Sequence, residues 1–195
     1  FYIKRIFDIV FSLFIAVFLL SWLIPILWVL VKLESKGPLI FKQNREGLNG
    51  NHFICYKFRS MRINDLSHKV HATKNDQRVT KIGSFLRKTS MDELPQFFNV
   101  LLGNMSVVGP RPHIESLSLE YQKEVEDYLK RHIVKPGITG LAQISGYRGE
   151  VQKRSDIKNR VRLDIFYIEN WSFLLDIKII IKTVFNAFKG DEKAY

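Results

Sequence analysis

Two adjacent carboxylates, Asp92 and Glu93, are the residues of this sequence best suited to covalent chemistry. The apolar positions 94, 97, 98, 101 and 102 recur at helical spacing, so we predict a buried helix that begins near Ser90 to Asp92 and ends at Gly103. A helix N-terminus lowers the pKa of a nearby carboxylate and attracts phosphate. Asp92 is therefore a candidate nucleophile toward phosphorus. Successive helical residues diverge by about 100°, so Glu93 would have a second task, holding a divalent cation.

The same segment has a purely structural interpretation. The pattern Ser90-x-x-Glu93 matches a capping box, and an acidic residue in the first turn suits the helix dipole. This interpretation explains the presence of Glu93 but assigns no role to Asp92.

Basic residues that could bind phosphate occur in several other segments. Arg111 lies between two prolines in Gly109-Pro110-Arg111-Pro112, which stiffens the backbone for bidentate binding; the alternative is a rigid turn whose arginine points to water. A predicted strand from Phe53 to Met61 places Lys57 and Arg59 on one face, which either binds an anion or is solvated. The remaining candidates are Arg87 and Lys88, ahead of the carboxylates, and Lys135 and Arg148 in glycine-containing turns.

Length and composition indicate one core and anionic partners. A chain of 195 residues with 46% hydrophobic content can bury a single core, and we expect one domain. The net charge of +11 favours nucleic acid, acidic lipid or phosphorylated substrates, but no nucleic-acid-binding motif is visible. Cys55 is the one cysteine, which fits a reducing compartment and a buried thiol. His68 and His71 lie in a polar segment, 64–76, that we expect to be an exposed loop, with both histidines solvated rather than metal-bound.

The N-terminal segment is apolar enough for a membrane. Residues 9–31 carry no charge and would form a helix of roughly 35 Å, comparable to the bilayer core. Basic residues flank both ends, which favours the cytoplasmic side for each. Ser21 and Pro25 would allow a break between them, so we predict a re-entrant helix; the alternative is an ordinary kinked transmembrane helix. Asp8 should sit at the interface, facing protein or cationic headgroups.

Two further helices are expected in the remaining sequence. Residues 114–131 form a highly charged amphipathic pattern that predicts a solvated helix. Residues 171–189 are apolar with a stripe of lysines, Lys178, Lys182 and Lys189, which predicts either an interfacial helix or a core helix with a solvent stripe.

Taken together, the order and spacing of the motifs resemble the monotopic phosphoglycosyl transferases, also called bacterial sugar transferases. The similarity covers nearly the whole chain. It is carried by Lys4-Arg5-x-x-Asp8, Lys36-Gly37-Pro38, Gln43-Asn44-Arg45-x-Gly47, Tyr56-Lys57-Phe58-Arg59-Ser60-Met61, Asp92-Glu93-Leu94-Pro95-Gln96, Gly109-Pro110-Arg111-Pro112 and Lys135-Pro136-Gly137-Ile138-Thr139-Gly140.

The resemblance implies a mainly helical α+β fold: one compact domain with a re-entrant membrane helix (1–36), a cytoplasmic catalytic domain (37–195), a small β element and interfacial amphipathic helices. It implies that Asp92 is the nucleophile, that Glu93 with Asp92 binds Mg²⁺, and that Arg111 clamps phosphate. The implied reaction has two steps: Asp92 takes a sugar phosphate from a UDP-sugar, and polyprenyl phosphate, such as undecaprenyl phosphate, then accepts it. The implied location is the cytoplasmic face of the bacterial inner membrane. A homo-oligomer is possible, and the resemblance does not decide the oligomeric state.

The sequence departs from the family pattern at the membrane hinge, where family members commonly have Ser-Pro and this chain has Ser21-Trp22 with Pro25 later. Gly146-Tyr147-Arg148-Gly149-Glu150 and Asn170-Trp171-Ser172 resemble members that transfer hexose phosphates. A transmembrane region often precedes the domain in that subgroup, which is consistent with the absence of an initiating methionine at Phe1. The alternatives are a non-catalytic membrane-anchored adaptor for acidic lipid or nucleic acid, and a degenerate member without turnover.

Overall fold

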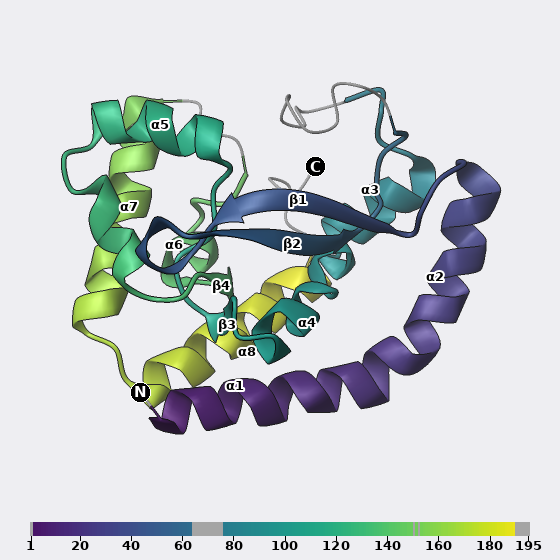
Figure 1. Ribbon diagram of the computed structural model, residues 1–195, viewed down its shortest axis with the longest axis horizontal. Helices are drawn as coiled ribbons and strands as arrows, with labels where there is room; N and C mark the ends of the chain where they lie inside the picture. Colours follow the sequence, from purple (N-terminus) through teal and green to yellow (C-terminus); the bar gives the residue numbers. More distant parts are fainter. Residues whose placement is uncertain (1, 64–75, 150, 152, 190–195) are drawn as a thin grey trace.

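Helices surround two small sheets in the computed structural model, which describes residues 2–63, 76–149, 151 and 153–189 (Figure 1). The predicted loop 64–76 with His68 and His71 lies almost wholly outside the described residues. In chain order the elements are α1 (Tyr2–Ile15), η1 (Ala16–Leu20), α2 (Ser21–Glu34), β1 (Ile40–Glu46), η2 (Leu48–Gly50), β2 (His52–Phe58), α3 (Lys81–Lys88), η3 (Met91–Glu93), α4 (Gln96–Leu101), β3 (Ser106–Val108), α5 (Glu115–Glu124), η4 (Tyr128–Ile133), β4 (Gly137–Thr139), α6 (Leu141–Ile144), α7 (Arg154–Glu169) and α8 (Phe173–Lys189). The mainly helical α+β prediction is confirmed.

The N-terminal helix bends without breaking. The π-helical segment η1 joins α1 to α2, and the chain turns there (Figure 1). The Ser21 hydroxyl donates to the Val17 carbonyl (2.5 Å) and the Trp22 indole to the Phe18 carbonyl (2.8 Å), which satisfies backbone oxygens in the irregular turn. Pro25 lies inside α2. The irregular turn η1 ends at Leu20, directly before Ser21, and the Ser21 hydroxyl bonds a carbonyl one turn earlier, as the sequence predicts. The hinge between Ser21 and Pro25 stays a prediction.

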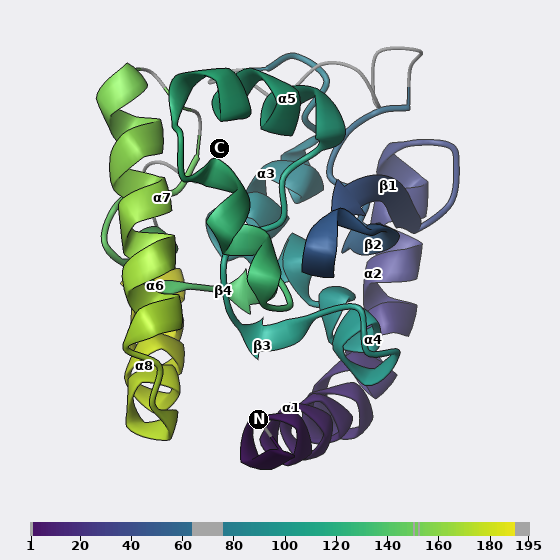
Figure 2. The same ribbon diagram turned by 60° about the vertical axis from the view of Figure 1, so that its left-hand side comes forward.

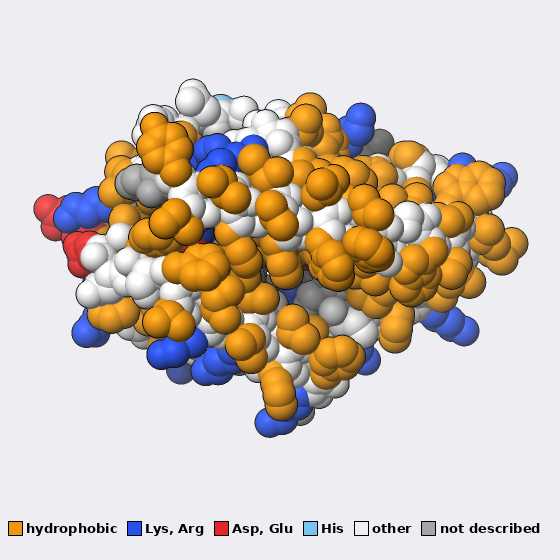
Figure 3. Space-filling view, turned by 90° about the horizontal axis from the view of Figure 1, so that it is seen from below, with side chains coloured by type: hydrophobic (Ala, Val, Ile, Leu, Met, Phe, Trp, Pro, Cys, Tyr) orange, Lys and Arg blue, Asp and Glu red, His pale blue; other side chains and the backbone are white. Residues whose placement is uncertain are grey.

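The outer face of this helix is strongly apolar. Among the described residues, Tyr2–Glu34 is the one helix long and apolar enough to cross a membrane by length and composition, and 22% of its most apolar 18-residue window is buried. Figure 3 looks onto the underside of the molecule, where hydrophobic side chains predominate. Soluble proteins rarely expose so large a patch without a partner for it. The exposed side chains on α1 and α2 include Ile6, Val10, Leu13, Phe14, Trp22, Ile26, Trp28 and Leu33.

Polar contacts fix α1 to the rest of the protein. Lys4 forms an ion pair with Asp176 of α8 (2.6 Å), and Arg5 donates to the carbonyls of Val100 (2.7 Å) and Leu101 at the end of α4. The Asp8 carboxylate, 3% exposed, accepts a hydrogen bond from the Val107 backbone (3.0 Å). Of the two environments predicted for Asp8, protein is thus the correct one.

The two sheets hold the middle of the chain together. Strands β1 and β2 form an antiparallel hairpin in which Ile40 pairs with Phe58. Strands β3 and β4 are parallel, although they are only three residues each. A Cβ on Gly137 would lie 2.1 Å from the Gly109 nitrogen, so glycine is required where these segments meet. Figure 2 shows α7 and α8 on the left, α2 on the right and α1 along the bottom, with β3 and α4 above α1.

Three hydrophobic clusters form the core. One packs β2, α4, β3 and α8, a second lies between α2, β2 and α3, and a third lies between α5, η4 and α7. Cys55 is 2% exposed within the first cluster, as predicted, and burial raises the pKa of its thiol.

The predicted charged helix 114–131 is wrong in both extent and exposure. The chain forms α5 and then the 3₁₀ segment η4, in which Tyr128 and Arg131 are 0% and 2% exposed. By contrast, α8 is a surface helix rather than a core helix, because it buries only Asp176 and Ile179 and exposes its three lysines beside Leu174, Ile181, Phe185 and Phe188. The interfacial position of α8 stays a prediction.

The predicted pairing of Lys57 and Arg59 on one strand face is wrong, because β2 ends at Phe58. Arg59 is 3% exposed and donates to the carbonyls of Lys36 (2.6 Å), Ser35 (2.7 Å) and Val31 (3.4 Å) at the end of α2. Arg59 is thus a helix-capping residue rather than an exposed anion ligand, because a helix C-terminus leaves carbonyls that a buried guanidinium can satisfy.

We therefore expect Arg59→Ala to destabilise the fold by about 2–3 kcal/mol, because it removes three hydrogen bonds that fix the end of α2 and empties the space of a buried side chain. In detergent micelles the midpoint of thermal unfolding should fall by roughly 5–10 °C. The matched control is Arg62→Ala at an exposed side chain, which should leave the midpoint unchanged. An Arg59→Ala protein with the original midpoint would contradict the capping role.

Candidate functional site

The carboxylate pair sits on a tight turn rather than at a helix start. Ser90 has a left-handed backbone (φ 60°), residues 91–93 form the short segment η3, and α4 begins only at Gln96. The Ser90 side chain makes no capping bond; its hydroxyl accepts a hydrogen bond from Arg148 (2.8 Å). The predicted helix start and the capping-box interpretation are both wrong, because the left-handed residue and the 3₁₀ turn place the start of α4 four to six residues further along.

Glu93 is held by two basic residues. Its Oε1 accepts from Arg111 (2.5 Å) and Lys57 (2.8 Å), and its Oε2 accepts from Arg111 (3.1 Å). Glu93 is 5% exposed, and burial alone would raise its pKa; Arg111 and Lys57 outweigh burial and hold the pKa of Glu93 well below its usual range. Glu93 is therefore an ionised and rigidly oriented carboxylate.

Asp92 has the opposite environment. It is 7% exposed, and no described residue donates a hydrogen bond to its carboxylate. Burial and the negative charge of Glu93 raise the pKa of Asp92, although Lys57, Arg87 and Arg148 act against this shift. The expectation of a pKa lowered by a helix N-terminus is wrong, since α4 starts beyond it. The expectation that the two carboxylates have different tasks agrees with these contrasting surroundings.

The predicted basic residues separate into two groups. Lys57, Arg111, Arg87 and Arg148 all act electrostatically on the carboxylate turn. One buried nitrogen of Arg87 has no hydrogen-bond partner in the described part of the chain. Lys88 is exposed at the end of α3, and Arg59 lies at the end of α2, outside the turn. Arg111 does not point to water, so the interpretation of its segment as a simple solvated turn is wrong.

Four consecutive carbonyls hold the Arg111 segment in place. Each backbone oxygen from Pro110 to His113 accepts a hydrogen bond from a distant part of the chain. In order, the donors are the Gly137 backbone (2.9 Å), the Arg131 side chain (2.8 Å), the Arg45 side chain (3.0 Å) and the Glu46 backbone (3.1 Å). The stiffness that the two prolines predict is therefore reinforced by tertiary contacts.

Arg131 is a positioning residue that sequence reasoning missed. It forms a buried ion pair with Asp164 of α7 (2.7 Å) and also donates to Nδ1 of His113 (2.7 Å). Burial and the nearby Arg131 hold the pKa of His113 well below its usual range, so the imidazole is neutral. Nothing local distinguishes Arg131 from the charged residues around it; a tyrosine at 128, one turn earlier, is the only hint of a buried face.

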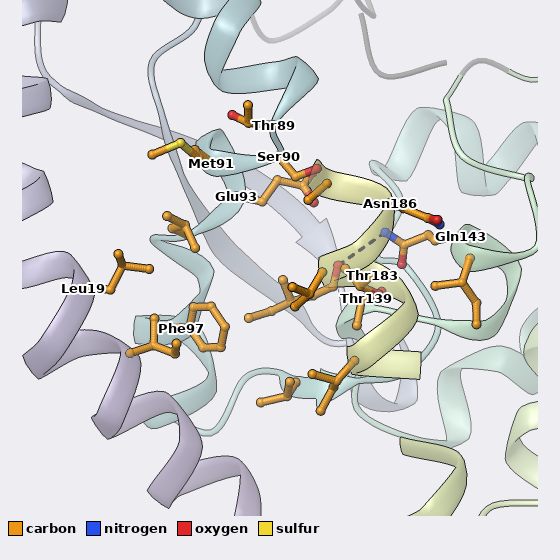
Figure 4. A pocket seen from close by; sticks show the side chains of 18 of the residues that line it. Leu19, Thr89, Ser90, Met91, Glu93, Phe97, Thr139, Gln143, Thr183 and Asn186 are labelled. Carbon is orange, nitrogen blue, oxygen red and sulfur yellow. Dashed lines mark hydrogen bonds between the residues drawn. The ribbon is translucent and has the colours of Figure 1, made fainter. Parts of the chain in front are cut away.

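A pocket of about 260 Å³ adjoins the turn (Figure 4). Leu19 and Phe97 lie on one side of it, Gln143 and Thr183 lie on the other, and Glu93 lies at one end. Most of the remaining wall is aliphatic or aromatic and comes from α1, α8, the carboxylate turn, the strands β3 and β4, and α6.

Residues that could hold a metal ion are few. Within the described ranges, no group of three or more His, Cys, Asp or Glu side chains is placed to bind one. The Asp92 carboxylate and Oε2 of Glu93 are the oxygens at the turn that could contribute to such a site.

We expect Arg131→Leu and Asp164→Leu each to destabilise the protein by about 3–5 kcal/mol, because each leaves a buried charge without its partner. The double variant should cost clearly less than the sum of the two, since it removes both charges. Urea unfolding in detergent measures all three. The control is Lys130→Leu, whose ion pair with Asp127 is exposed and should not contribute measurably. If the double variant lost as much unfolding free energy as the two single variants together, the two buried charges would not be coupled.

Comparison with known proteins gives the family. A family described as bacterial sugar transferase matches residues 1–190. The UDP-glucose:undecaprenyl-phosphate glucose-1-phosphate transferase of Klebsiella pneumoniae is 52% identical over 95% of this chain and 40% of its own length, and the protein of the same name from Escherichia coli K12 is 49% identical over 95% and 40%. The exopolysaccharide production protein PSS of Rhizobium leguminosarum bv. phaseoli is 44% identical over 93% of both chains.

This chain spans about two fifths of the length of the first two relatives. Its similarity to all three nevertheless includes the carboxylate turn, the Arg111 segment and the N-terminal helix, because each alignment covers at least 93% of the chain. By the extent of these matches, the chain belongs to the bacterial sugar transferase family.

Proposed function

We propose that this protein transfers a hexose 1-phosphate from a UDP-hexose to undecaprenyl phosphate, the first step of lipid-linked glycan synthesis. The observation that carries the proposal is the contrast within the turn: Glu93 is fixed by Arg111 and Lys57, whereas the buried Asp92 carboxylate has no donor among the described residues. A carboxylate without hydrogen bonds, surrounded by cations, is suited to attack an electrophile. The names of the Klebsiella and Escherichia relatives supply the substrate classes to test.

In the proposed first step, an oxygen of Asp92 attacks the phosphorus that carries the sugar. A bond forms between Asp92 and phosphorus, the bridging phosphorus–oxygen bond breaks, and UMP leaves with the electron pair. In the second step, an oxygen of undecaprenyl phosphate attacks the same phosphorus and displaces Asp92. The lipid diphosphate-linked hexose is released and the free carboxylate is restored.

The basic residues have separate tasks in this scheme. Arg111 uses both terminal nitrogens to hold Glu93, and its remaining N–H groups are available to phosphate oxygens. Lys57, Arg87 and Arg148 act against the rise in the pKa of Asp92 that burial causes, and so favour the ionised form that attacks. Together these charges favour the negative charge that develops on the departing phosphate.

Magnesium fits the turn as a partner of the substrate rather than as a resident ion. Mg²⁺ prefers oxygen ligands, keeps several waters and takes the rest from one or two carboxylates and substrate phosphates. We propose Glu93, with Asp92 adjoining it, as those carboxylates. When bound, the ion would neutralise charge on the diphosphate.

The structure suits a location at the membrane surface. The apolar face of α1 and α2 and the exposed hydrophobic residues of α8 are unlike a water-exposed surface. We propose that the bent helix enters the cytoplasmic leaflet of the bacterial inner membrane and returns, which leaves residues 37–195 on the cytoplasmic side. An adaptor function would need the basic surface but not the buried ion pairs of Glu93, and no observation favours it.

We expect Asp92→Asn to lower transfer roughly a thousandfold or more, because the nearly isosteric amide cannot act as the nucleophile. The full protein in membranes would be incubated with Mg²⁺, undecaprenyl phosphate and UDP-glucose or UDP-galactose, and released UMP and labelled lipid would be measured. Asp127→Asn, at an exposed carboxylate, is the matched control. A fully active Asp92→Asn protein would remove Asp92 from the mechanism.

The re-entrant topology predicts that cysteines placed at positions 2 and 36 react from the same side. Tyr2 and Lys36 are both exposed, and Cys55 is too buried to compete for a reagent. A membrane-impermeant maleimide should label both sites in inverted inner-membrane vesicles and neither in spheroplasts. Labelling of the two sites from opposite sides would replace the re-entrant helix by a span.

A further inference from the structure

The pocket beside the turn joins two chemically different regions. At one end it is lined by Ser90, Glu93 and Arg148, and Arg148 donates to the Ser90 hydroxyl (2.8 Å). Away from that end, the walls are apolar side chains, among them Phe11 and Ile15 of α1 and Ile180 of α8. A ligand that matches both regions has an apolar chain with an anionic group at its end.

The α8 wall of the pocket is continuous with exposed apolar residues of the same helix. Val184 lines the pocket and is 49% exposed. Phe185 and Phe188, further along α8, are 73% and 89% exposed. A hydrophobic chain that lies against these exposed residues therefore meets the pocket wall at Val184.

The basic residues around the turn differ in their relation to the pocket. Arg148 lines the pocket, whereas Lys57 and Arg111, which hold Glu93, are not among its lining residues. An anionic group bound in the pocket would therefore pair with Arg148 rather than with Lys57 or Arg111.

We propose that this pocket binds the isoprene units nearest the phosphate of the acceptor lipid, with that phosphate beside Arg148 and Ser90. The proposal rests on the proposed function, because it assumes a polyprenyl phosphate acceptor. The volume of about 260 Å³ is smaller than the roughly 300–1,000 Å³ of pockets that enclose whole ligands. Only the first part of a long chain fits, and the remainder extends along the exposed apolar residues of α8. The acceptor thus reaches the turn through the pocket, and the UDP-hexose binds beside Lys57 and Arg111, outside the pocket.

The competing occupant is the sugar of the donor. Gln143 lines the pocket and is 9% exposed, and its Oε1 has no hydrogen-bond partner in the part of the chain that the structure describes. A sugar hydroxyl could donate to it. The predominance of apolar wall favours the isoprenoid chain, because a sugar would leave most of its hydroxyls unpaired there.

The test fills the pocket by Ala187→Phe in the full protein in membranes. Ala187 lines the pocket, so the added ring should occupy the space of the isoprene units. We expect kcat/KM for undecaprenyl phosphate to fall about tenfold or more, with the loss in the acceptor parameters rather than in the KM for UDP-hexose. Ile181→Phe is the matched control, because it adds a ring to the same helix at a side chain that is 58% exposed and outside the pocket.

A second measurement tests the proposal even if the Ala187→Phe protein does not fold. A prenyl phosphate that carries a photoreactive diazirine in its first isoprene units should cross-link, in the unmodified protein, to peptides from α1, α4 or α8 that line the pocket. Cross-links confined to other segments would overturn the proposal. A folded Ala187→Phe protein with normal acceptor kinetics would also overturn the proposal. A raised KM for UDP-hexose alone would overturn it too, and would indicate that the pocket binds the sugar of the donor. Failure of the proposed function is a separate result: no UMP would then be released by the unmodified protein.

Discussion

The buried ion pairs of Glu93 with Arg111 and Lys57 are the interaction on which the rest of the site depends. A carboxylate that is 5% exposed is stable only if its charge is matched, because an unpaired buried charge costs several kcal/mol. Arg111 must then be held in one place, and the chain achieves this with hydrogen bonds to every carbonyl from Pro110 to His113. The buried Arg131–Asp164 pair belongs to this support, although it lies away from the carboxylates.

The same supports connect the site to the membrane helix. Asp8 of α1 accepts a hydrogen bond from Val107, and β3 ends one residue later, just before the segment that carries Arg111. Arg5 binds the carbonyls at the end of α4, the helix that follows the carboxylate turn. Because α1 is bound on both sides of the site, the depth of Asp92 relative to the apolar underside is determined by the fold. A reaction between a lipid and a water-soluble donor requires such a constant level.

Two neighbouring carboxylates that are almost equally buried have different properties because their contacts differ. Glu93 faces Arg111 and Lys57, which lower its pKa, whereas Asp92 keeps a raised pKa and no hydrogen bond from the described residues. The 3₁₀ turn is the reason, since it directs adjacent side chains in different directions without engaging either in a helix cap. One residue can therefore be a fixed charge while the next remains free to react.

From the sequence alone, Asp92, Glu93, Lys57 and Arg111 could be singled out as candidate site residues, and the apolar helices at the two ends of the chain could be predicted, because residue type, motif spacing and hydrophobic periodicity are local properties. The roles of Arg59 and Arg131, the bend at Ala16–Leu20 and the true start of α4 could not. The sequence around an arginine does not show whether its side chain lies in water, caps a helix or pairs with a buried aspartate 33 positions away. Only the tertiary structure decides between these outcomes, since the partner that makes burial of a charge favourable comes from a distant part of the chain.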